Sequence, residues 1–341
     1  MSGPFRVGVT RDLRGADGEP VHDLGLDALG AADGVTWEFL ARHETELTPA
    51  TIAGYDALMV WEPGGVTDAT LAGATRPALI ARFGMGLEAI DLDACTRHGV
   101  LVTTEPYAVR EVMPAAAIGF LLALAHRIPE KDRLVREGRW EDRFGLVGTG
   151  TAGRTLGVIG LGNVGRGVVR MAEPLGLRRL AYDPYADRAS VPAGVELVDL
   201  DALLRSADFV CVTCPLTPET HHLIDAQRLA AMKRGAQLIN VARGPIVDTL
   251  ALAAALRDGH LAGAALDVFE REPVEPDHPL LALDNVILSP HAVGYTGAAF
   301  RGLGAGACRS VLAVARGEIP EHVANAAVLA ALPSIPQKEI A

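Results

Sequence analysis

Short apolar segments alternate with polar, helix-compatible segments along the first hundred residues. The apolar segments FRVGVT, DALMVW, ALIARF and VLVT occupy positions 5–10, 56–61, 78–83 and 100–103. A short helix is expected over 91–98 with Asp91 as its N-cap, because an aspartate side chain accepts hydrogen bonds from free N–H groups of the first turn. Strands separated by helices predict a small α/β domain with a parallel sheet.

Helical periodicity dominates the next segment. It covers 113–127, and Pro114 falls in the first turn, where a missing N–H group is tolerated. A polar, glycine-rich connection is expected to follow over 129–153.

The alternation of strands and helices resumes after this connection. Helices over 200–206, 226–232 and 249–258 separate most of the apolar runs, which predicts a doubly wound sheet of six or seven strands. The predicted strands cover 156–159, 180–182, 196–198, 209–213, 237–240, 263–268 and 286–288.

A last helix is expected over 298–316. Gly302, Gly304 and Gly306 each weaken it by about 1 kcal/mol relative to alanine. These glycines either permit close packing or make the segment mobile. Residues 333–341 are expected to form a disordered tail.

A glycine motif lies at the start of the second α/β region. Gly160, Gly162 and Gly165 follow the apolar run 156–159, and Asp183 ends the next run, 23 residues after Gly160. In a strand–turn–helix–strand unit, the first glycine allows the tight turn, the second lets the backbone approach a pyrophosphate, and the third allows close packing of helix and strand. An acid about 20 residues further on can bind a ribose diol. The motif predicts a dinucleotide site.

Composition narrows the class of protein. The length of 341 residues suggests about two domains, and 31 basic against 42 acidic residues give a net charge of −11. An acidic surface argues against nucleic acid and anionic membranes as partners. Because no apolar run approaches the ~20 residues of a membrane span and no signal-peptide pattern is present, a cytoplasmic location is expected.

Cysteine and histidine pairs offer alternatives that we consider structural. Cys211 and Cys214 form a CxxC within an apolar run, where residues three apart on a strand point to opposite faces. No second CxxC completes a zinc set, and the pair His221–His222 has only Glu219 nearby as a carboxylate. No metal site is expected.

Three polar residues follow predicted strands of the second region. Arg243 comes after QLINVA, Glu272 after GAALDV, and His291 after VILS. Ligands of open parallel sheets bind beyond the carboxyl ends of the strands, so these residues would lie on the dinucleotide side. A histidine can move a hydroxyl proton during hydride transfer, a carboxylate can fix its tautomer, and an arginine can orient a substrate carboxylate. Alternatively, each is an ordinary loop residue.

Six segments together resemble the D-isomer-specific 2-hydroxyacid dehydrogenase family. In chain order they are ARFGMGLEAIDLDACTRHGVLVT, GVIGLGNVG, CPLTPETHHLID, INVARGPIVD, AALDVFEREP and NVILSPHAVGYT, and the resemblance extends over about residues 55 to 325. The resemblance implies two doubly wound parallel-sheet domains, with a Rossmann-type cofactor domain inserted into a flavodoxin-like substrate domain. The implied boundaries are 1–104 plus 295–332 for the substrate domain and 105–294 for the NAD-binding domain.

The resemblance also implies an activity, namely NAD-dependent oxidation of a 2-hydroxy acid or reduction of a 2-oxo acid. It implies Arg243, Glu272 and His291 as catalytic residues, with His291 as acid and base. It implies that substrate is bound by Gly84, Met85 and Gly86 together with Arg243, and that the protein is a homodimer through the cofactor domain. The implied cofactor-binding residues are Gly160, Gly162, Asn163, Val164, Gly165, Asp183, Pro215, Thr220, Ala242, Arg243, Asp267, His291 and Gly294.

Two features of the reaction stay open at this stage. NAD is expected over NADP because Asp183 would repel a 2′-phosphate, although Arg188 in the following loop could soften this preference. The substrate side chain is not fixed. Alternatives are oxidation of a simpler anion, such as formate or phosphite, and an NAD-sensing scaffold or co-regulator without turnover.

Overall fold

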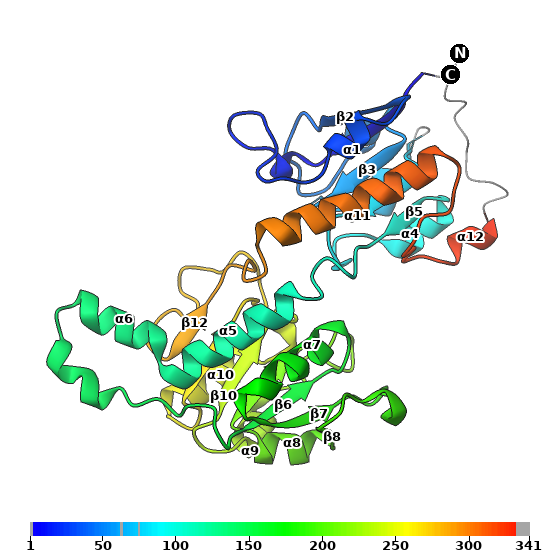
Figure 1. The fold of residues 1–341 in the computed structure, drawn as a ribbon. Coiled ribbons are helices and arrows are strands. Elements are labelled where there is room, and N and C mark those ends of the chain that lie inside the picture. The colour runs from blue at the N-terminus through cyan, green and yellow to red at the C-terminus, as the bar shows by residue number, and fades with distance from the viewer. Residues whose placement is uncertain (1–2, 62–63, 74–75, 332–341) are drawn as a thin grey trace. The chain divides into compact units, whose positions relative to one another are not determined.

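The computed structural model describes residues 3–61, 64–73 and 76–331. The predicted disordered tail, 333–341, lies outside the described residues. The chain divides into two compact units, one formed by the residues up to Val109 together with those from Tyr295, and the other by Arg110–Gly294 (Figure 1).

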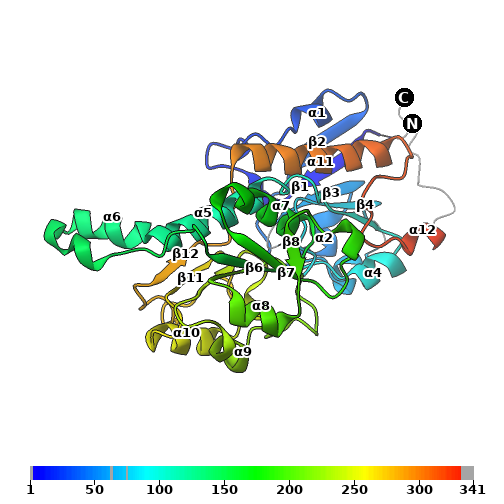
Figure 2. The ribbon, with the colours of Figure 1, turned by 60° about the horizontal axis from the view of Figure 1, so that its bottom comes forward.

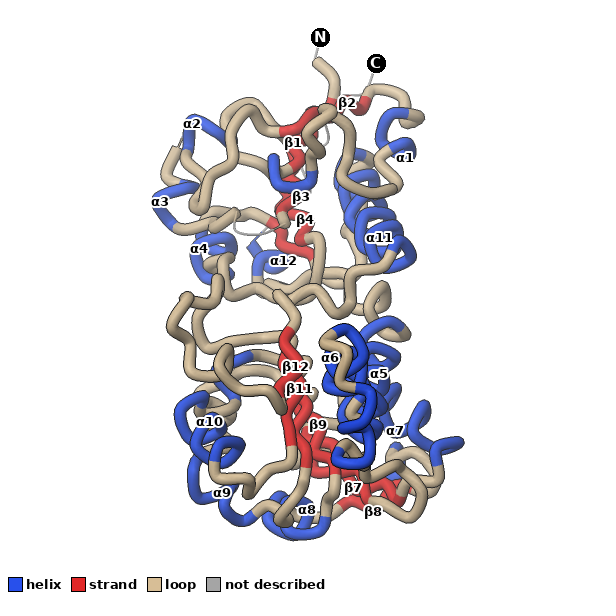
Figure 3. The backbone as a smooth tube through the Cα atoms, turned by 90° about the vertical axis from the view of Figure 1, so that its left-hand side faces the viewer, coloured by secondary structure: helices blue, strands red, loops and turns tan. Residues whose placement is uncertain are grey.

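The first unit contains a five-stranded parallel sheet of order β2-β1-β3-β4-β5. Figure 3 shows α1 (Asp27–Gly30) and α11 (Gly297–Ala315) on one face and α2 (Pro49–Ile52), α3 (Asp68–Leu71) and α4 (Leu92–Arg97) on the other. A short α12 (Val328–Ala331) follows α11. This strand order is that of a flavodoxin-like sheet. The strands are β1 (Phe5–Val9), β2 (Val35–Phe39), β3 (Ala57–Val60), β4 (Leu79–Arg82) and β5 (Leu101–Thr103).

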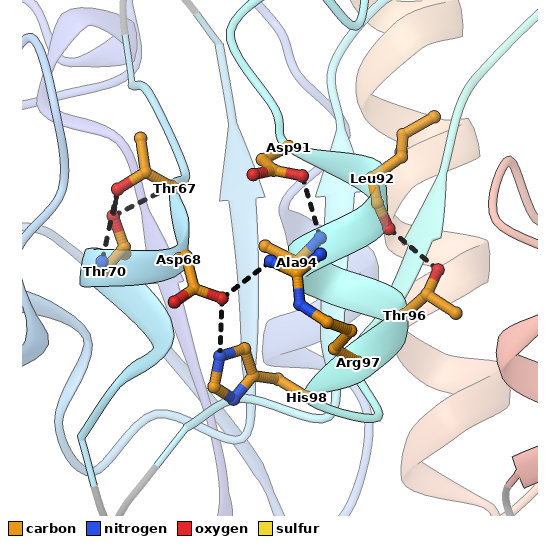
Figure 4. Close-up of polar contacts among 9 residues, drawn as sticks. All are labelled: Thr67, Asp68, Thr70, Asp91, Leu92, Ala94, Thr96, Arg97 and His98. Carbon is orange, nitrogen blue, oxygen red and sulfur yellow. Dashed lines mark hydrogen bonds and ion pairs between the residues drawn. The ribbon is translucent and has the colours of Figure 1, made fainter.

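The predicted cap at Asp91 is confirmed. Its Oδ1 accepts a hydrogen bond of 2.8 Å from the Ala94 N–H at the start of α4 (Figure 4). At the other end of α4, Arg97 and His98 both contact Asp68 Oδ1, at 2.8 and 3.1 Å. These contacts connect α4 to the first turn of α3.

One strand of the first sheet contradicts the sequence interpretation. The pattern predicts a polar, helix-compatible stretch around residues 35–39, but Val35–Phe39 form β2 at the edge of the sheet, paired only with β1 among the described strands. Glu38 is exposed while Val35 is buried. Because an edge strand exposes many of its side chains to solvent, its sequence contains few consecutive apolar residues.

The second unit contains a seven-stranded parallel sheet of order β12-β11-β10-β9-β6-β7-β8. With β6 as the first strand, this is the Rossmann order with one strand added beyond the sixth. Both topologies confirm the predicted fold class. The strands are β6 (Thr155–Ile159), β7 (Arg178–Tyr182), β8 (Val195–Leu197), β9 (Phe209–Val212), β10 (Gln237–Asn240), β11 (Gly263–Leu266) and β12 (Val286–Leu288).

Helices cover both faces of the second sheet. Figure 3 shows α5 (Val112–His126) and α7 (Asn163–Ala172) on one face, and α9 (Ala226–Ala231) and α10 (Thr249–Arg257) on the other. A further helix, α8 (Leu200–Ser206), packs against α9. The two cysteines of the CxxC belong to different apolar clusters, Cys211 with α5 and α7 and Cys214 with α8 to α10, as expected of opposite faces. Burial raises the pKa of Cys211 to about 12 and that of Cys214 to about 11, so both thiols stay protonated and inert at neutral pH.

The connection after α5 was predicted incorrectly. It forms a helix, α6 (Ile128–Arg136), and a 3-10 segment, Trp140–Gly145, which project from the second unit (Figure 2). Pro129 occupies the first turn of α6, and Leu134 is its only buried residue among those described. None of the helices in the described residues has by itself the length and apolar character of a membrane span. The pair α5 and α6, bent by 60°, has them only when the two helices are taken together, and only by length and composition.

The glycines of α11 allow close packing. A Cβ atom on Gly304 would lie 1.9 Å from the Leu24 carbonyl oxygen, and one on Gly306 would lie 1.7 Å from Glu105 Oε2. The helix therefore sits against neighbouring backbone and a buried carboxylate, and the close-packing alternative holds.

Candidate active site

The glycine motif connects β6 to α7 in a tight turn. Gly160 has a φ of +95°, and a Cβ atom there would lie 2.6 Å from the Cys214 backbone nitrogen. A Cβ on Gly165 would lie 2.0 Å from the Gly160 carbonyl oxygen, whereas one on Gly162 would meet no atom within 4 Å. Packing therefore requires the outer two glycines, and the middle one leaves open space beside the N-terminus of α7, where Asn163 and Val164 begin the helix. A helix start with free N–H groups suits a phosphate.

Asp183 follows β7 and is held against this turn. Its Oδ2 accepts a hydrogen bond of 2.8 Å from the Leu161 N–H, and its Oδ1 accepts one of 2.9 Å from the Tyr185 N–H. The side chain is partly exposed. The two N–H groups fix the carboxylate beside the glycine turn, where a ribose diol would be expected.

The loop after β9 is also bound to the glycine turn. The Thr213 hydroxyl donates to the Gly160 carbonyl oxygen at 2.7 Å. Thr220 closes the loop, because its hydroxyl donates to the Pro215 carbonyl oxygen at 2.7 Å and its oxygen accepts the Thr217 N–H at 2.7 Å. Pro215 and Thr220, both predicted, thus belong to one compact loop at the β6–β9 boundary, where the strand order reverses. Thr213 was not predicted as part of this site, because its hydroxyl lies in an apolar strand pattern.

Arg243 follows β10 in a loop that is fixed on both sides. The buried Asn240 side chain donates to the Arg243 carbonyl oxygen at 2.9 Å and accepts the Ala242 N–H at 3.0 Å. A Cβ atom on Gly244 would lie 1.9 Å from the Phe269 carbonyl carbon. The loop after β10 therefore packs directly on the loop after β11, which carries Glu272.

Glu272 and His291 form a hydrogen-bonded pair. His291 Nδ1 lies 2.8 Å from Glu272 Oε2, and the Phe269 N–H donates to Glu272 Oε1 at 2.9 Å. Burial alone would raise the pKa of Glu272, but the hydrogen bonds from His291 and Phe269 and the charges of His291 and Arg243 outweigh it and lower the pKa.

The backbone around His291 is held by Asp267. Its Oδ1 accepts the N–H groups of Ala292 at 2.8 Å and Val293 at 2.9 Å, and its carbonyl oxygen accepts the His291 N–H at 2.8 Å. Burial raises the pKa of Asp267 despite these hydrogen bonds. Asp267 thus orients the segment that presents His291. Gly294 ends this segment, and a Cβ there would lie 2.5 Å from Met113 Sδ.

A second histidine–carboxylate pair lies among the neighbouring loops. His222 Nε2 is 2.9 Å from Glu270 Oε2, and Glu270 Oε1 accepts the Thr249 N–H at 2.8 Å. The His222 N–H donates to the Pro245 carbonyl oxygen at 2.7 Å. The pair connects three loops. Because its two residues are 48 positions apart, no local sequence pattern predicts it.

The predicted carboxylate-binding turn belongs to the first unit. Gly84 follows β4 with a φ of +142°, and the exposed Met85 is the tip of the turn. The buried Arg82 donates through Nε to the Gly86 carbonyl oxygen at 2.8 Å, and the Glu105 N–H donates to the Gly84 carbonyl oxygen at 3.1 Å. These contacts fix the backbone of the turn.

The Glu272–His291 pair makes folding stability depend on pH. Because the folded pKa of Glu272 is below its ordinary value, the pair stabilises the protein above that ordinary value, and this contribution is lost as pH falls through the folded pKa. We expect Glu272→Gln to lower the free energy of unfolding at pH 7 and to have a smaller effect at pH 3. Urea unfolding at both pH values measures this, and an equal loss at both would contradict it.

Several known proteins are similar to this chain over most of its length. The model of the D-isomer-specific 2-hydroxyacid dehydrogenase NAD-binding domain matches residues 118–293. A glyoxylate reductase of Thermofilum pendens is 38% identical over 82% of this chain and 84% of its own length. A D-3-phosphoglycerate dehydrogenase of Methanocaldococcus jannaschii is 39% identical over 84% of this chain and 53% of its own length. The structure of Aquifex aeolicus D-lactate dehydrogenase complexed with NAD and lactic acid is similar, with a TM-score of 0.79, 27% identity, and coverage of 92% of this chain and 96% of that one.

The chain belongs to the D-isomer-specific 2-hydroxyacid dehydrogenase family. This confirms the predicted family, and with it the predicted activity class, an NAD-dependent oxidoreductase of 2-hydroxy or 2-oxo acids. The dinucleotide turn, Asp183 and the strand-end loops all lie within the matched NAD-binding domain.

Proposed function

We propose that this dehydrogenase reduces a small 2-oxo acid to the 2-hydroxy acid, with His291 as the proton donor. NADH, when held by the second unit, would supply the hydride for the carbonyl carbon. Protonated His291 gives its Nε2 proton to the carbonyl oxygen, since Nδ1 is engaged by Glu272 at 2.8 Å. The carboxylate favours the protonated ring and fixes its orientation. The Glu272–His291 contact is the observation that carries the proposal.

The second unit fits a dinucleotide. The open space over Gly162 and the first N–H groups of α7 suit a pyrophosphate, and Asp183 suits a ribose diol. Pro215, Thr220, Ala242 and Asp267 lie in loops at the carboxyl ends of strands, where the rest of the cofactor would run. The substrate carboxylate would bind the backbone N–H groups of the Gly84–Gly86 turn and the Arg243 guanidinium.

Steady-state assays with NADH and a set of 2-oxo acids test the function. Glyoxylate, pyruvate, hydroxypyruvate, phenylpyruvate and 4-methyl-2-oxopentanoate span the relevant side chains. Turnover of at least one, with release of the 2-hydroxy acid, is expected. NADH binding without turnover of any 2-oxo acid would favour a sensing scaffold, and NAD-dependent oxidation of formate or phosphite alone would favour a simpler anion as substrate.

Cofactor choice depends on Asp183. Its carboxylate is fixed by two N–H groups next to the ribose position, so it would repel a 2′-phosphate. We expect Asp183→Ala to raise the ratio of kcat/KM for NADPH to that for NADH by about 10-fold or more, since loss of one repulsive charge contributes roughly 1–2 kcal/mol. Arg188→Ala serves as the control for the basic loop residue. An unchanged ratio in Asp183→Ala would argue against Asp183 as the selecting residue.

We also propose a homodimer formed through the second unit, in a cytoplasmic location. The projecting segment of α6 and Trp140–Gly145 supports the dimer because it exposes large apolar side chains. Trp140 is 60% exposed and Phe144 77% exposed. Exposed apolar residues gathered on one segment are typical of protein–protein interfaces.

A further inference from the structure

Glu105 is a buried carboxylate at the end of the first sheet. It lies two residues after β5, and its side chain is 6% exposed. A buried carboxylate is costly unless it is paired with a cation. Glu105 Oε2 accepts a hydrogen bond of 3.2 Å from the guanidinium of Arg309 on α11. This pair connects the segment after β5 to the helix that covers one face of the sheet.

The carboxylate lies against bare backbone of α11. A Cβ atom on Gly306 would lie 1.7 Å from Glu105 Oε2 and 2.3 Å from its Cδ. One turn earlier on α11, a Cβ atom on Gly302 would lie 3.2 Å from the Ala108 Cβ. Gly302 and Gly306 are four positions apart and therefore share one face of the helix. The segment 105–108 thus lies along this face, and the carboxylate occupies space that a side chain at position 306 would fill.

The main chain of Glu105 holds the turn that would bind the substrate carboxylate. Its N–H donates to the Gly84 carbonyl oxygen at 3.1 Å. At the other end of the turn, Arg82 Nε donates to the Gly86 carbonyl oxygen at 2.8 Å. The peptide bond from Gly84 to Met85 is planar and trans, so this carbonyl group and the Met85 N–H point in opposite directions. The contact with Glu105 therefore sets the direction in which the Met85 N–H is offered to a ligand.

We propose that Glu105 is a positioning residue for the substrate carboxylate. Its side chain, anchored by Arg309, keeps the segment after β5 on α11. Its N–H thereby stays on the Gly84 carbonyl oxygen and aims the Met85 N–H at the substrate. The inference rests on the proposed function, in which the Gly84–Gly86 turn binds that carboxylate. Because the carboxylate is present in the ground state and the transition state alike, loss of this alignment raises KM and leaves kcat almost unchanged.

Steady-state kinetics of the full-length protein test the proposal. In Glu105→Ala we expect KM for the 2-oxo acid to rise about 10-fold or more, the usual effect of losing a charged hydrogen bond, while kcat stays within about 3-fold of the native value. Arg309→Met should give the same split, because it leaves the buried carboxylate without its cation. Arg309→Lys should keep KM within about 3-fold of native, because a single N–H contact does not need the planar guanidinium.

Glu318 supplies the matched control. It pairs with Arg316, just after α11, at 2.8 Å, and both side chains are 56% exposed. An exposed ion pair contributes little to stability, so Glu318→Gln should leave both KM and kcat at their native values. The affinity for NADH should be native in all of these variants, because the proposed dinucleotide turn belongs to the second unit.

Binding of oxamate separates this proposal from the proposed function. Oxamate resembles a 2-oxo acid but resists hydride attack, so calorimetric titration into the protein with NADH needs no turnover. Weaker oxamate binding in Glu105→Ala and Arg309→Met, with no 2-oxo acid reduced by the native protein, would support the positioning role and contradict the function. Native turnover with unchanged KM in both variants, or a fall in kcat alone, would overturn the positioning role and leave the function intact. A native protein that neither reduced a 2-oxo acid nor bound oxamate would overturn both.

The Arg309 variants keep the test decisive if Glu105→Ala does not fold. The Arg309 side chain is 67% exposed, so its replacement by methionine or lysine disturbs little packing. A raised KM in Arg309→Met together with a native KM in Arg309→Lys would support the positioning role without the Glu105 variant. Equal KM values in the two would overturn it.

Discussion

Substitution of His291 by asparagine is expected to lower kcat for 2-oxo acid reduction by about 10²- to 10⁴-fold, the usual contribution of a positioned proton donor. Asparagine keeps a polar side chain next to Glu272 but cannot deliver a proton from a charged form. Binding of NADH should change little, because the proposed dinucleotide turn and Asp183, which would hold the other end of the cofactor, are left intact. Stopped-flow measurement of NADH oxidation gives the rate, and fluorescence of bound NADH gives the affinity.

His222 provides a matched control for this experiment. It too is paired with a glutamate, at 2.9 Å, and its side chain is 36% exposed against 35% for His291. His222→Asn should change kcat by less than about 10-fold, because the His222–Glu270 pair connects loops and has no part in the proposed proton transfer. If both variants lost the same activity, the loss would reflect disturbed loops, and His291 would not be the proton donor.

Substitution of Arg243 by lysine is expected to lower kcat/KM for the 2-oxo acid by about 10²- to 10³-fold, the range for loss of one oriented donor to a developing charge. Lysine retains the positive charge but lacks the planar pair of N–H groups that binds a carboxylate through two bonds. Since Asn240 and Gly244 fix the loop backbone, the change is confined to the side chain. Kinetics at varied 2-oxo acid concentration measure the effect.

Arg228 offers the corresponding control. The Arg243 guanidinium donates to the Ala242 carbonyl oxygen at 2.7 Å. The Arg228 guanidinium likewise donates to a backbone carbonyl oxygen, that of Leu223 at 2.9 Å, but Arg228 lies on α9. Arg228→Lys should leave kcat/KM within about 3-fold of the native value. If Arg243→Lys retained the native kcat/KM, a positive charge alone would be enough to bind the substrate carboxylate, and the proposed two-bond contact would be wrong.

The strand ends of the second unit could be predicted because buried parallel strands are continuous apolar runs. QLIN, GAAL and VIL each precede one of Arg243, Glu272 and His291, and all three strands are adjacent in the sheet. Adjacent parallel strands deliver their following residues to one edge. The glycine spacing and Asp183 predicted the dinucleotide turn, because packing requires Gly160 and Gly165, and Gly162 leaves open space where a pyrophosphate would lie.

Other features leave little trace in local sequence. The edge strand β2 exposes Glu38 to solvent, and α6 buries only Leu134 among its described residues, so neither shows a continuous apolar run. The His222–Glu270 pair joins residues 48 apart through three loops. The Trp61 ring packs against those of Tyr295 and Phe300, which lie more than 230 positions later in the chain. Such contacts depend on tertiary structure rather than on periodicity.

The apolar core of the first unit has a consequence for synthesis of the chain. Phe5, Met59 and Phe83 belong to the same core cluster as Phe300 and Val311 of α11. The ribosome makes Arg110–Gly294 between these two parts, which takes on the order of 10 to 40 s at about 5–20 residues per second. During this time one apolar face of the N-terminal strands stays uncovered, while the second unit forms its own sheet. We therefore expect chaperones to bind the nascent chain mainly at the N-terminal strands, which are synthesised first but are covered by α11 only near the end of synthesis.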